Sequence, residues 1–330
     1  MAMEHFRDKK ILITGGLGFI GSNLGRRLVG LGADVTLVDS LVPLYGGCLF
    51  NIHDIREQVT VNLGDVRDPH ALTHLLEGKD YLFNLAGQTS HVDSMDDPQT
   101  DLAINAAAQL SILEVCRKVN PSIKIVFAGT RQVYGKPKYL PVDEKHPANP
   151  IDVNGINKLA GEQYHRLYSD IYGIRTCALR LTNTYGPGMR VKDARQTFLG
   201  VWIRQLLEGQ PIEIFGDGLQ RRDFNYVEDC VDAMLLAAMS SVANGKIYNL
   251  GCKEVINLKD LAVMMTSLGY GGSFKLVPFP RERKVIDIGD YYGDFSLIRD
   301  DLGWSPRVAL PQGLSTTLSY YSKHGKNYWA

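Results

Sequence analysis

The segment from Lys10 to Ser40 constrains the fold more than any other part of the chain. It begins with a short apolar run at residues 11–13, followed by a turn with three glycines, Gly15, Gly18 and Gly21. A helical pattern at 22–31, a second apolar run at 35–38 and an acid, Asp39, come next. This order predicts a strand, a tight turn, a helix and a second, parallel strand that ends in a carboxylate. Such a unit belongs to a parallel sheet covered by helices.

The glycine turn and the acid suit the binding of a dinucleotide. Glycines allow a sharp turn and close approach of the backbone to a pyrophosphate, while the free N–H groups of the helix face the phosphates. Asp39 follows Gly21 by 18 residues and is placed to accept hydrogen bonds from the adenosine ribose. A carboxylate there would repel a 2′-phosphate, and no arginine follows it directly, so we predict NAD rather than NADP.

Composition argues against several other classes of protein. The 330 residues contain 36 Lys and Arg and 36 Asp and Glu, so no overall field favours nucleic acid or an anionic membrane. Five cysteines without a Cys-x-x-Cys pair favour a reducing compartment. No secretory h-region and no apolar run of spanning length is present, so we expect a cytoplasmic protein. His70 and His74 have metal-compatible spacing but no third ligand, so no metal is expected.

Further apolar runs alternate with helical patterns in the first half of the chain. The expected strands are residues 59–61, 81–85, 123–127 and 176–180. The expected long helices are residues 101–119 and 153–172. We therefore predict an α/β fold with a Rossmann-type, doubly wound parallel sheet. Ligands of such sheets bind at the carboxyl ends of the strands, which here carry Asp65, Gln88, Thr130 and Asn183.

After about residue 183 the pattern loosens into shorter pieces. Helices are expected over 197–208 and 227–239 and from about 310, and a strand over 212–215. No repeat or long linker is present. We expect a second, smaller α/β lobe over residues 183–330, with part of 225–255 returning to the first domain, residues 1–182.

Seven short stretches carry sequences typical of one enzyme family. They are TGGLGFIG (14–21), GDVRD (64–68), NLAGQ (84–88), TRQVYG (130–135), RLTNTYGP (180–187), GDGLQRRDF (216–224) and LGWSP (302–306). In these stretches, over nearly its whole length, the chain resembles the extended short-chain dehydrogenase/reductase family, specifically the NAD-dependent nucleotide-sugar epimerases and dehydratases. The resemblance implies that residues 1–182 bind NAD and that residues 183–330 mainly bind a nucleotide-diphosphate sugar.

The resemblance also implies roles for individual residues. Those expected to contact NAD are Gly15, Gly18, Phe19, Ile20, Asp39, Ser40, Asp65, Val66, Leu85, Ala86, Gln88 and Lys158. Those expected to contact the substrate are Thr130, Asn183, Arg222 and either Arg281 or Arg283, of which we name Arg283. Arg222 has an independent argument, since a guanidinium suits bidentate phosphate recognition, although an ion pair with Asp223 is the alternative. A homodimer through the two long helices is expected by analogy.

One family motif is altered in this chain. Members normally carry Tyr-x-x-x-Lys, with a tyrosine that takes a hydroxyl proton, whereas the same register here reads Asn154-Gly155-Ile156-Asn157-Lys158. An amide can orient a hydroxyl but cannot hold its proton. We therefore assign Thr130, Asn154 and Lys158 as catalytic residues and leave the proton acceptor open among Lys158, His91, Asp93 and an ordered water.

The residues after Thr130 narrow the reaction. Dehydratases of the family carry an Asp-Glu pair there, where this chain has Arg131-Gln132, so neither titratable group is present. We therefore predict an NAD-dependent epimerase, similar to UDP-glucose 4-epimerase, that acts through a transient keto-sugar. The alternatives are a nucleotide-sugar oxidoreductase, a dehydratase, and a catalytically quiet NAD-binding protein.

Overall fold

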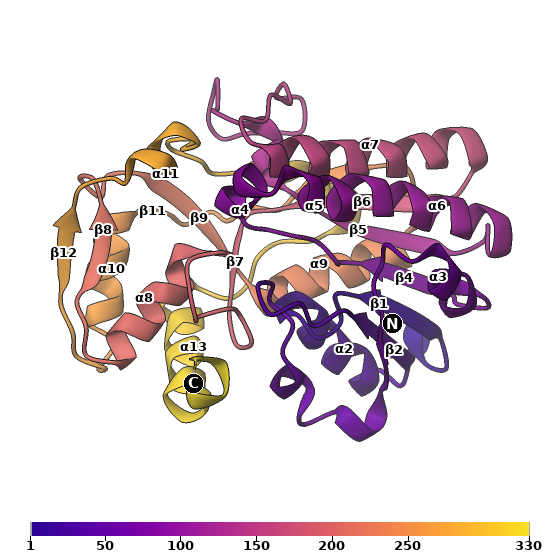
Figure 1. The fold of residues 1–330 in the computed structure, drawn as a ribbon, viewed down its shortest axis with the longest axis horizontal. Coiled ribbons are helices and arrows are strands. Elements are labelled where there is room, and N and C mark those ends of the chain that lie inside the picture. The colour runs from indigo at the N-terminus through magenta and orange to yellow at the C-terminus, as the bar shows by residue number, and fades with distance from the viewer. Residues whose placement is uncertain (1, 330) are drawn as a thin grey trace.

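Seven parallel strands form the central sheet of the computed structural model, which describes residues 2–329 (Figure 1). In spatial order they are β10 (Ile247–Asn249), β6 (Arg175–Leu181), β5 (Lys124–Thr130), β4 (Tyr81–Asn84), β1 (Lys10–Thr14), β2 (Asp34–Asp39) and β3 (Thr60–Leu63). Because β1 lies between β2 and β4, the order of strands reverses beside it. Ligands of such sheets bind at the carboxyl ends near this reversal.

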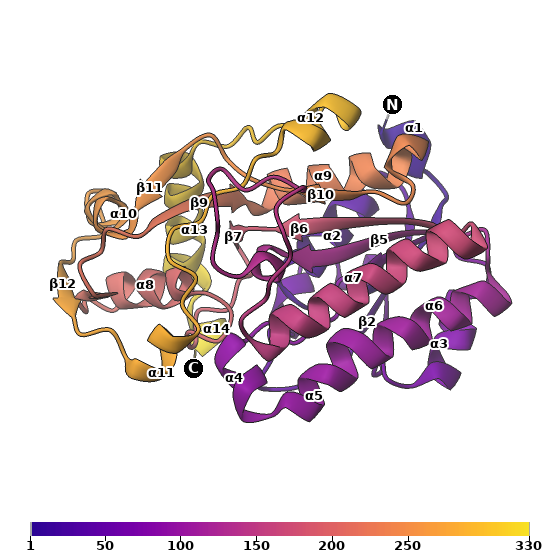
Figure 2. The ribbon, with the colours of Figure 1, turned by 90° about the horizontal axis from the view of Figure 1, so that it is seen from above.

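Helices cover both faces of this sheet (Figures 1 and 2). One face carries α2 (Phe19–Gly30) and α9 (Val227–Met239), and the other carries α3 (Pro69–Leu76), α6 (Ala108–Val119) and α7 (Val153–Tyr172). Side chains alternate along the strands, so that Ile13 of β1 packs under α2 and α9 whereas Leu12 packs toward the opposite helices. The predicted doubly wound α/β fold is confirmed.

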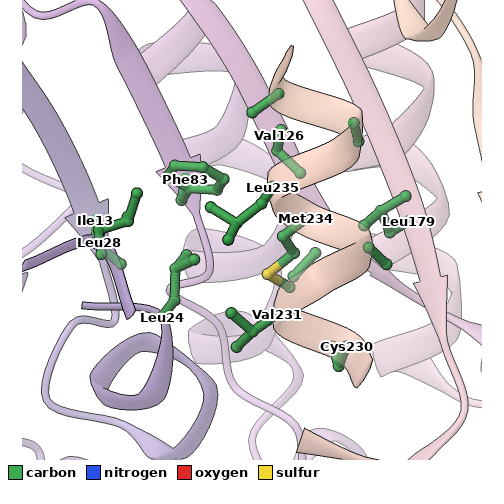
Figure 3. Packing of buried hydrophobic residues seen from close by; sticks show 14 of the residues in the cluster. Ile13, Leu24, Leu28, Phe83, Val126, Leu179, Cys230, Val231, Met234 and Leu235 are labelled. Atoms are coloured by element: carbon green, nitrogen blue, oxygen red, sulfur yellow. The ribbon is translucent and has the colours of Figure 1, made fainter. Parts of the chain in front are cut away.

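The core beneath α2 and α9 joins residues that are far apart in the sequence. Figure 3 shows Leu24 of α2 and Leu235 of α9 close to Phe83 and Ile13 of the sheet. All of these side chains are almost fully buried. Two segments from the second half of the chain, α9 and β10, therefore complete the layers that the first half begins.

The second lobe is smaller and has a mixed sheet. Its strands are β7 (Asn183–Tyr185), β9 (Arg221–Tyr226) and β11 (Val255–Asn257), with the separate parallel pair β8 (Ile212–Phe215) and β12 (Phe274–Val277). Three helices, α8 (Phe198–Leu207), α10 (Leu258–Thr266) and α13 (Leu310–His324), surround them. Trp202, Leu261 and Leu314 lie in the buried core between these elements.

Short helices complete the described chain: α1 (Ala2–Phe6), Leu49–Ile52, Arg56–Gln58, α4 (His91–Asp96), α5 (Pro98–Leu102), Arg131–Tyr134, Ser241–Ala243, α11 (Arg281–Val285), α12 (Ser296–Leu302) and α14 (Lys326–Trp329). The helix predicted over 101–119 starts earlier than expected, because Asp97 caps a helical turn at Pro98–Leu102. A π turn at Ala103–Ala107 lies between Pro98–Leu102 and α6. Within residues 2–329, no helix combines the length and apolar character needed to cross a bilayer.

Candidate active site

Two adjoining cavities, each of about 290 Å³, lie where the sheet meets the second lobe. The first is lined by the glycine turn and by residues at the carboxyl ends of β2 to β6, and the second by residues of α4, α8 and the segment around α11. Six of the described residues line both: His91, Arg131, Gln132, Asn183, Gln196 and Thr197. The two cavities therefore form one continuous site with two compartments.

The glycine turn at the start of α2 leaves room for a phosphate. Gly18 is the N-cap of α2 and supplies no side chain to the first N–H groups of the helix. A Cβ on Gly21 would collide with the carbonyl oxygen of Gly15, and one on Gly15 would lie 3.0 Å from the backbone of Ala86. Gly15 and Gly21 thus allow the turn to pack tightly against α2 and the end of β4, and Gly18 leaves the first N–H groups of α2 uncapped, which fits the pyrophosphate of a dinucleotide.

Asp39 lies at the carboxyl end of β2 beside this turn. Its carboxylate accepts hydrogen bonds from the backbone N–H groups of Leu17 and Leu41, at 3.1 and 2.9 Å. Burial raises the pKa of Asp39, and the two backbone donors oppose that rise. The carboxylate is thus fixed at the wall of the first cavity, as binding of a ribose requires.

Most residues predicted to bind ligands line the two cavities. The first holds Gly15, Gly18, Phe19, Ile20, Asp39, Ser40, Asp65, Val66, Leu85, Ala86, Thr130, Asn154, Lys158 and Asn183, and the second holds Asn183, Arg222 and Arg283. Gln88 is the exception among the described residues, since it lines neither cavity. Its side chain hydrogen-bonds the backbone of Ser90, and its contact with the dinucleotide stays a prediction.

Asn154 is held by a buried carboxylate that the sequence analysis missed. Its Nδ2 donates to Oδ2 of Asp101 at 2.9 Å and to the carbonyl oxygen of Gln88 at 2.8 Å. Asp101 is fully buried and also accepts from the amides of Asn105 and Asn157, at 3.0 and 2.8 Å. The amide of Asn154 is therefore fixed as a donor to Asp101, and no local sequence pattern marks Asp101, because its contacts come from Asn105, Asn154 and Asn157 on different segments.

Lys158 lies one helical turn after Asn154 and also borders the first cavity. Its Nζ donates to the carbonyl oxygen of Ala128 at 3.2 Å and lies 5.2 Å from the centre of the Phe127 ring. A Cβ on Gly87 would approach Nζ to 2.7 Å. Burial lowers the pKa of Lys158 to about 8, and attraction to Asp101 offsets part of that effect.

Three elements bring His91, Gln132 and Asp152 together where the cavities meet. Nδ1 of His91, at the start of α4, lies 3.0 Å from Oδ2 of Asp152, the N-cap of α7. Nε2 of His91 lies 2.7 Å from Nε2 of Gln132, which follows β5. Burial tends to raise the pKa of Asp152, but the hydrogen bond and charge of His91 hold it below its ordinary value.

Two arginines border the second cavity. Nη2 of Arg131 donates to Oδ1 of Asn183 at 3.1 Å, and its guanidinium lies over the ring of Tyr291 at 5.0 Å. Arg222 donates to the carbonyl of Arg221 at 2.9 Å and lies 3.8 Å from Asp287. Burial and then repulsion from Arg131 lower the pKa of Arg222 to about 10.

Two guanidinium groups border one cavity, an arrangement that suits an anionic ligand. The alternative pairing of Arg222 with Asp223 is not formed, because Asp223 instead accepts from the hydroxyl of Thr182 at 2.5 Å and from the backbone N–H of Gly293 at 3.0 Å.

Unsatisfied polar atoms gather at this site. Among the described residues, six buried side-chain atoms have no partner in hydrogen-bond geometry, and three of these belong to the cavity-lining residues Arg131, Gln132 and Gln205. A fourth, Nδ1 of His91, has only the ion contact with Asp152 at 3.0 Å. Buried polar groups are normally paired, so this concentration indicates a polar ligand. No group of three metal-ligating side chains is present in the part of the chain that the structure describes.

Comparisons with known proteins agree with this geometry. Residues 11–251 match the family model described as NAD dependent epimerase/dehydratase family. A putative UDP-glucose 4-epimerase of Methanocaldococcus jannaschii is 34% identical over 96% of this chain and 99% of its own.

Two solved structures are similar over nearly their whole length. An epimerase of Methanothermobacter thermautotrophicus has a TM-score of 0.92 at 25% identity, covering 98% of this chain and 95% of its own. UDP-glucose 4-epimerase of Thermotoga maritima, solved with UDP-glucose, has a TM-score of 0.87 at 29% identity, covering 95% of this chain and 99% of its own.

Proposed function

Because the chain belongs to the NAD-dependent epimerase/dehydratase family, and is thus an NAD-dependent enzyme of nucleotide-sugar metabolism, we propose that it is a nucleotide-sugar 4-epimerase. It inverts a sugar hydroxyl through a transient keto-sugar, as the prediction from its sequence states. The observation that carries this proposal is the pair of adjoining cavities, one with a glycine turn and Asp39, the other with two arginines, which meet beside Thr130.

The first cavity would hold NAD in the domain of residues 1–182, together with the returning β10 and α9. When bound, NAD takes hydrogen with its electron pair from the sugar carbon and later gives it back. Backbone N–H groups of the glycine turn would hold the pyrophosphate and Asp39 the adenosine ribose. Lys158 would place its charge beside the nicotinamide ribose, where it favours loss of a proton from the reacting hydroxyl.

The second cavity would hold the nucleotide diphosphate sugar, mainly through residues 183–330. Asn183, Arg222 and Arg283 would contact the diphosphate, and Arg131 adds a second guanidinium next to Arg222. Thr130, at the end of β5, would hydrogen-bond the reacting hydroxyl. Epimerisation is favoured over dehydration because Arg131 and Gln132 stand where a dehydratase needs an acid and a base.

Purified protein tests this function directly. We expect NAD to remain bound through purification and to be identified by mass spectrometry after denaturation. Incubation with UDP-glucose or UDP-glucuronate is expected to yield the C4 epimer by NMR, without net reduction of the cofactor. Net reduction would indicate an oxidoreductase instead, and binding of UDP-sugars with no conversion would indicate a quiet NAD-binding protein.

We also propose that two copies of the chain pair through α6 and α7. These helices expose several large apolar side chains: Leu110, Val119, Ile156, Leu167, Ile171 and Tyr172. Leu167 and Ile171 are one turn apart on α7, with 49% and 65% of their surfaces exposed, so they share one face of the helix. An exposed apolar stripe of this kind suits packing against a second copy of the same helices.

A further inference from the structure

We propose that His91, oriented by Asp152, is the acid–base group that takes the place of the missing tyrosine. This inference rests on the proposed function, because it names the proton acceptor of the same epimerisation. It begins from a side chain that lines both compartments at their junction.

The position of His91 is fixed from two sides of the predicted reaction centre. Asp152, its partner at 3.0 Å, precedes Asn154 by two residues, and Gln132, its partner at 2.7 Å, follows Thr130 by two residues. Asn154 itself touches α4, since its backbone N–H donates to Oγ of Ser94 at 3.2 Å. The imidazole therefore contacts the two segments that carry Thr130 and Asn154, and it borders the same cavity as both residues.

The hydrogen bond with Gln132 and the ion contact with Asp152 indicate the tautomer of His91. The amide of Gln132 donates to Nε2, so Nε2 carries a lone pair and the ring proton is on Nδ1, facing the carboxylate of Asp152. The side chain of His91 is 30% exposed, whereas that of Asp152 is 2% exposed. A substrate hydroxyl that displaces the Gln132 amide would donate to the same lone pair, and Asp152 would stabilise the imidazolium that results.

The charged groups around His91 favour this role. Asp152 faces it from α7, and Arg131 acts on Asp152 from the segment after β5. On its own helix, Asp93 is engaged by Arg195 at 2.8 Å and is not free to serve as the base. Burial lowers the pKa of Lys158, also on α7, to about 8, attraction to Asp101 offsets part of that effect, and its Nζ donates to the carbonyl oxygen of Ala128 at 3.2 Å.

The proton balance of the reaction is simple. In the first half, the C–H bond at the reacting carbon breaks and its hydrogen leaves with both electrons to the NAD that the family supplies. The O–H bond breaks as well, its proton passes to Nε2 of His91, and a carbonyl forms. In the second half, hydrogen and electron pair return to the opposite face, and Nε2 returns the proton to the oxygen.

Turnover and pH profile test the inference in the full-length protein with bound NAD. His91→Gln is expected to lower turnover of UDP-glucose about 10²–10⁴-fold and to remove the loss of activity at acidic pH. Asp152→Asn keeps a residue that caps helices, and we expect it to move the acid limb to lower pH, because the imidazolium loses its carboxylate. His74→Gln, an exposed histidine on α3, is the matched control and should behave as wild type.

NMR of histidine-labelled protein gives a readout that does not depend on turnover. The His91 signal, assigned through His91→Gln, should titrate differently in Asp152→Asn and should shift on addition of UDP-glucose, while the His74 signal stays unchanged. Wild-type turnover in His91→Gln, or reduced turnover with an unaltered pH profile, would overturn the inference. A wild-type protein that converts no UDP-sugar would contradict the proposed function. A His91 signal that responds neither to Asp152→Asn nor to UDP-glucose would overturn the role of His91 alone and leave the proposed function standing.

Discussion

At the scale of single residues, Asn154 is coupled to a buried acid. Asp101 has no exposed surface, and the amides of Asn105, Asn154 and Asn157 surround it. A buried carboxylate is stable when several donors and a nearby cation compensate for lost hydration, and Lys158 supplies that cation. Asn154 thus donates to the same carboxylate that attracts Lys158.

The pair Asn154 and Asn157 separates stability from catalysis. Each donates one hydrogen bond to Asp101, but Asn154 lines the first cavity and, among the described lining residues, Asn157 does not appear. We expect Asn154→Ala and Asn157→Ala each to lower the free energy of unfolding by about 1–3 kcal/mol, measured in urea. Only Asn154→Ala is expected to reduce turnover as well as stability. Equal turnover in the two variants would show that Asn154 has no role in the active site.

At the scale of elements, α7 organises the site through a buried polar stripe. Asn154, Lys158, Glu162 and His165 follow one another at intervals of three or four residues, and all four are buried. Glu162 pairs with Arg180 of β6 at 2.6 Å, and Nδ1 of His165 lies 2.7 Å from the carbonyl oxygen of Gly161. The same face that presents Lys158 to the cavity therefore also fixes the helix on the sheet.

His165 makes the packing of α7 sensitive to acid. Burial lowers the pKa of His165 to about 4, so the folded protein keeps the ring neutral while the unfolded chain takes up a proton below about pH 6.5. Its contribution to stability is complete above pH 6.5 and is lost progressively as the pH falls toward 4. Between pH 7 and 5 the loss from this group is about 2 kcal/mol.

Urea unfolding at pH 7 and pH 5 measures this effect. His165→Gln should show a pH dependence smaller than that of wild type by about this 2 kcal/mol. The exposed His70 on α3 provides a comparison, and His70→Gln should retain the wild-type dependence. Identical pH dependence in wild type and His165→Gln would show that the ring is not held neutral.

Sequence patterns predicted the elements whose signal is local. The bounds of α7 agree with the predicted 153–172, because Asp152 caps its start and Gly173 ends it in a left-handed conformation. Strands β9 and β11 were not predicted, since their short segments are defined by pairing with each other and not by a periodic pattern. The contact of His91 with Asp152 and Gln132 joins three separate elements, so spacing alone does not reveal it.

At the scale of the whole molecule, the exposed apolar stripe on α7 predicts the oligomeric state. We expect a dimer by light scattering, and Ile171→Glu should raise its dissociation constant at least about tenfold, because burial of one isoleucine is worth about 1.5–3 kcal/mol. Leu219→Glu, at a side chain of the second lobe with 61% exposure, is the control and should remain dimeric. NAD binding should be unchanged in both, and a monomeric wild type would contradict the proposed pairing.

The late position of α9 in the chain has a consequence for biosynthesis. Leu235 and its neighbours on this helix cover Phe83 and Val126, which a ribosome produces more than a hundred residues earlier. Until α9 is synthesised, the nascent sheet exposes apolar side chains on one face and cannot shield them stably. We therefore expect a protein truncated after residue 182 to depend on chaperones or to precipitate, however complete its cofactor motif looks.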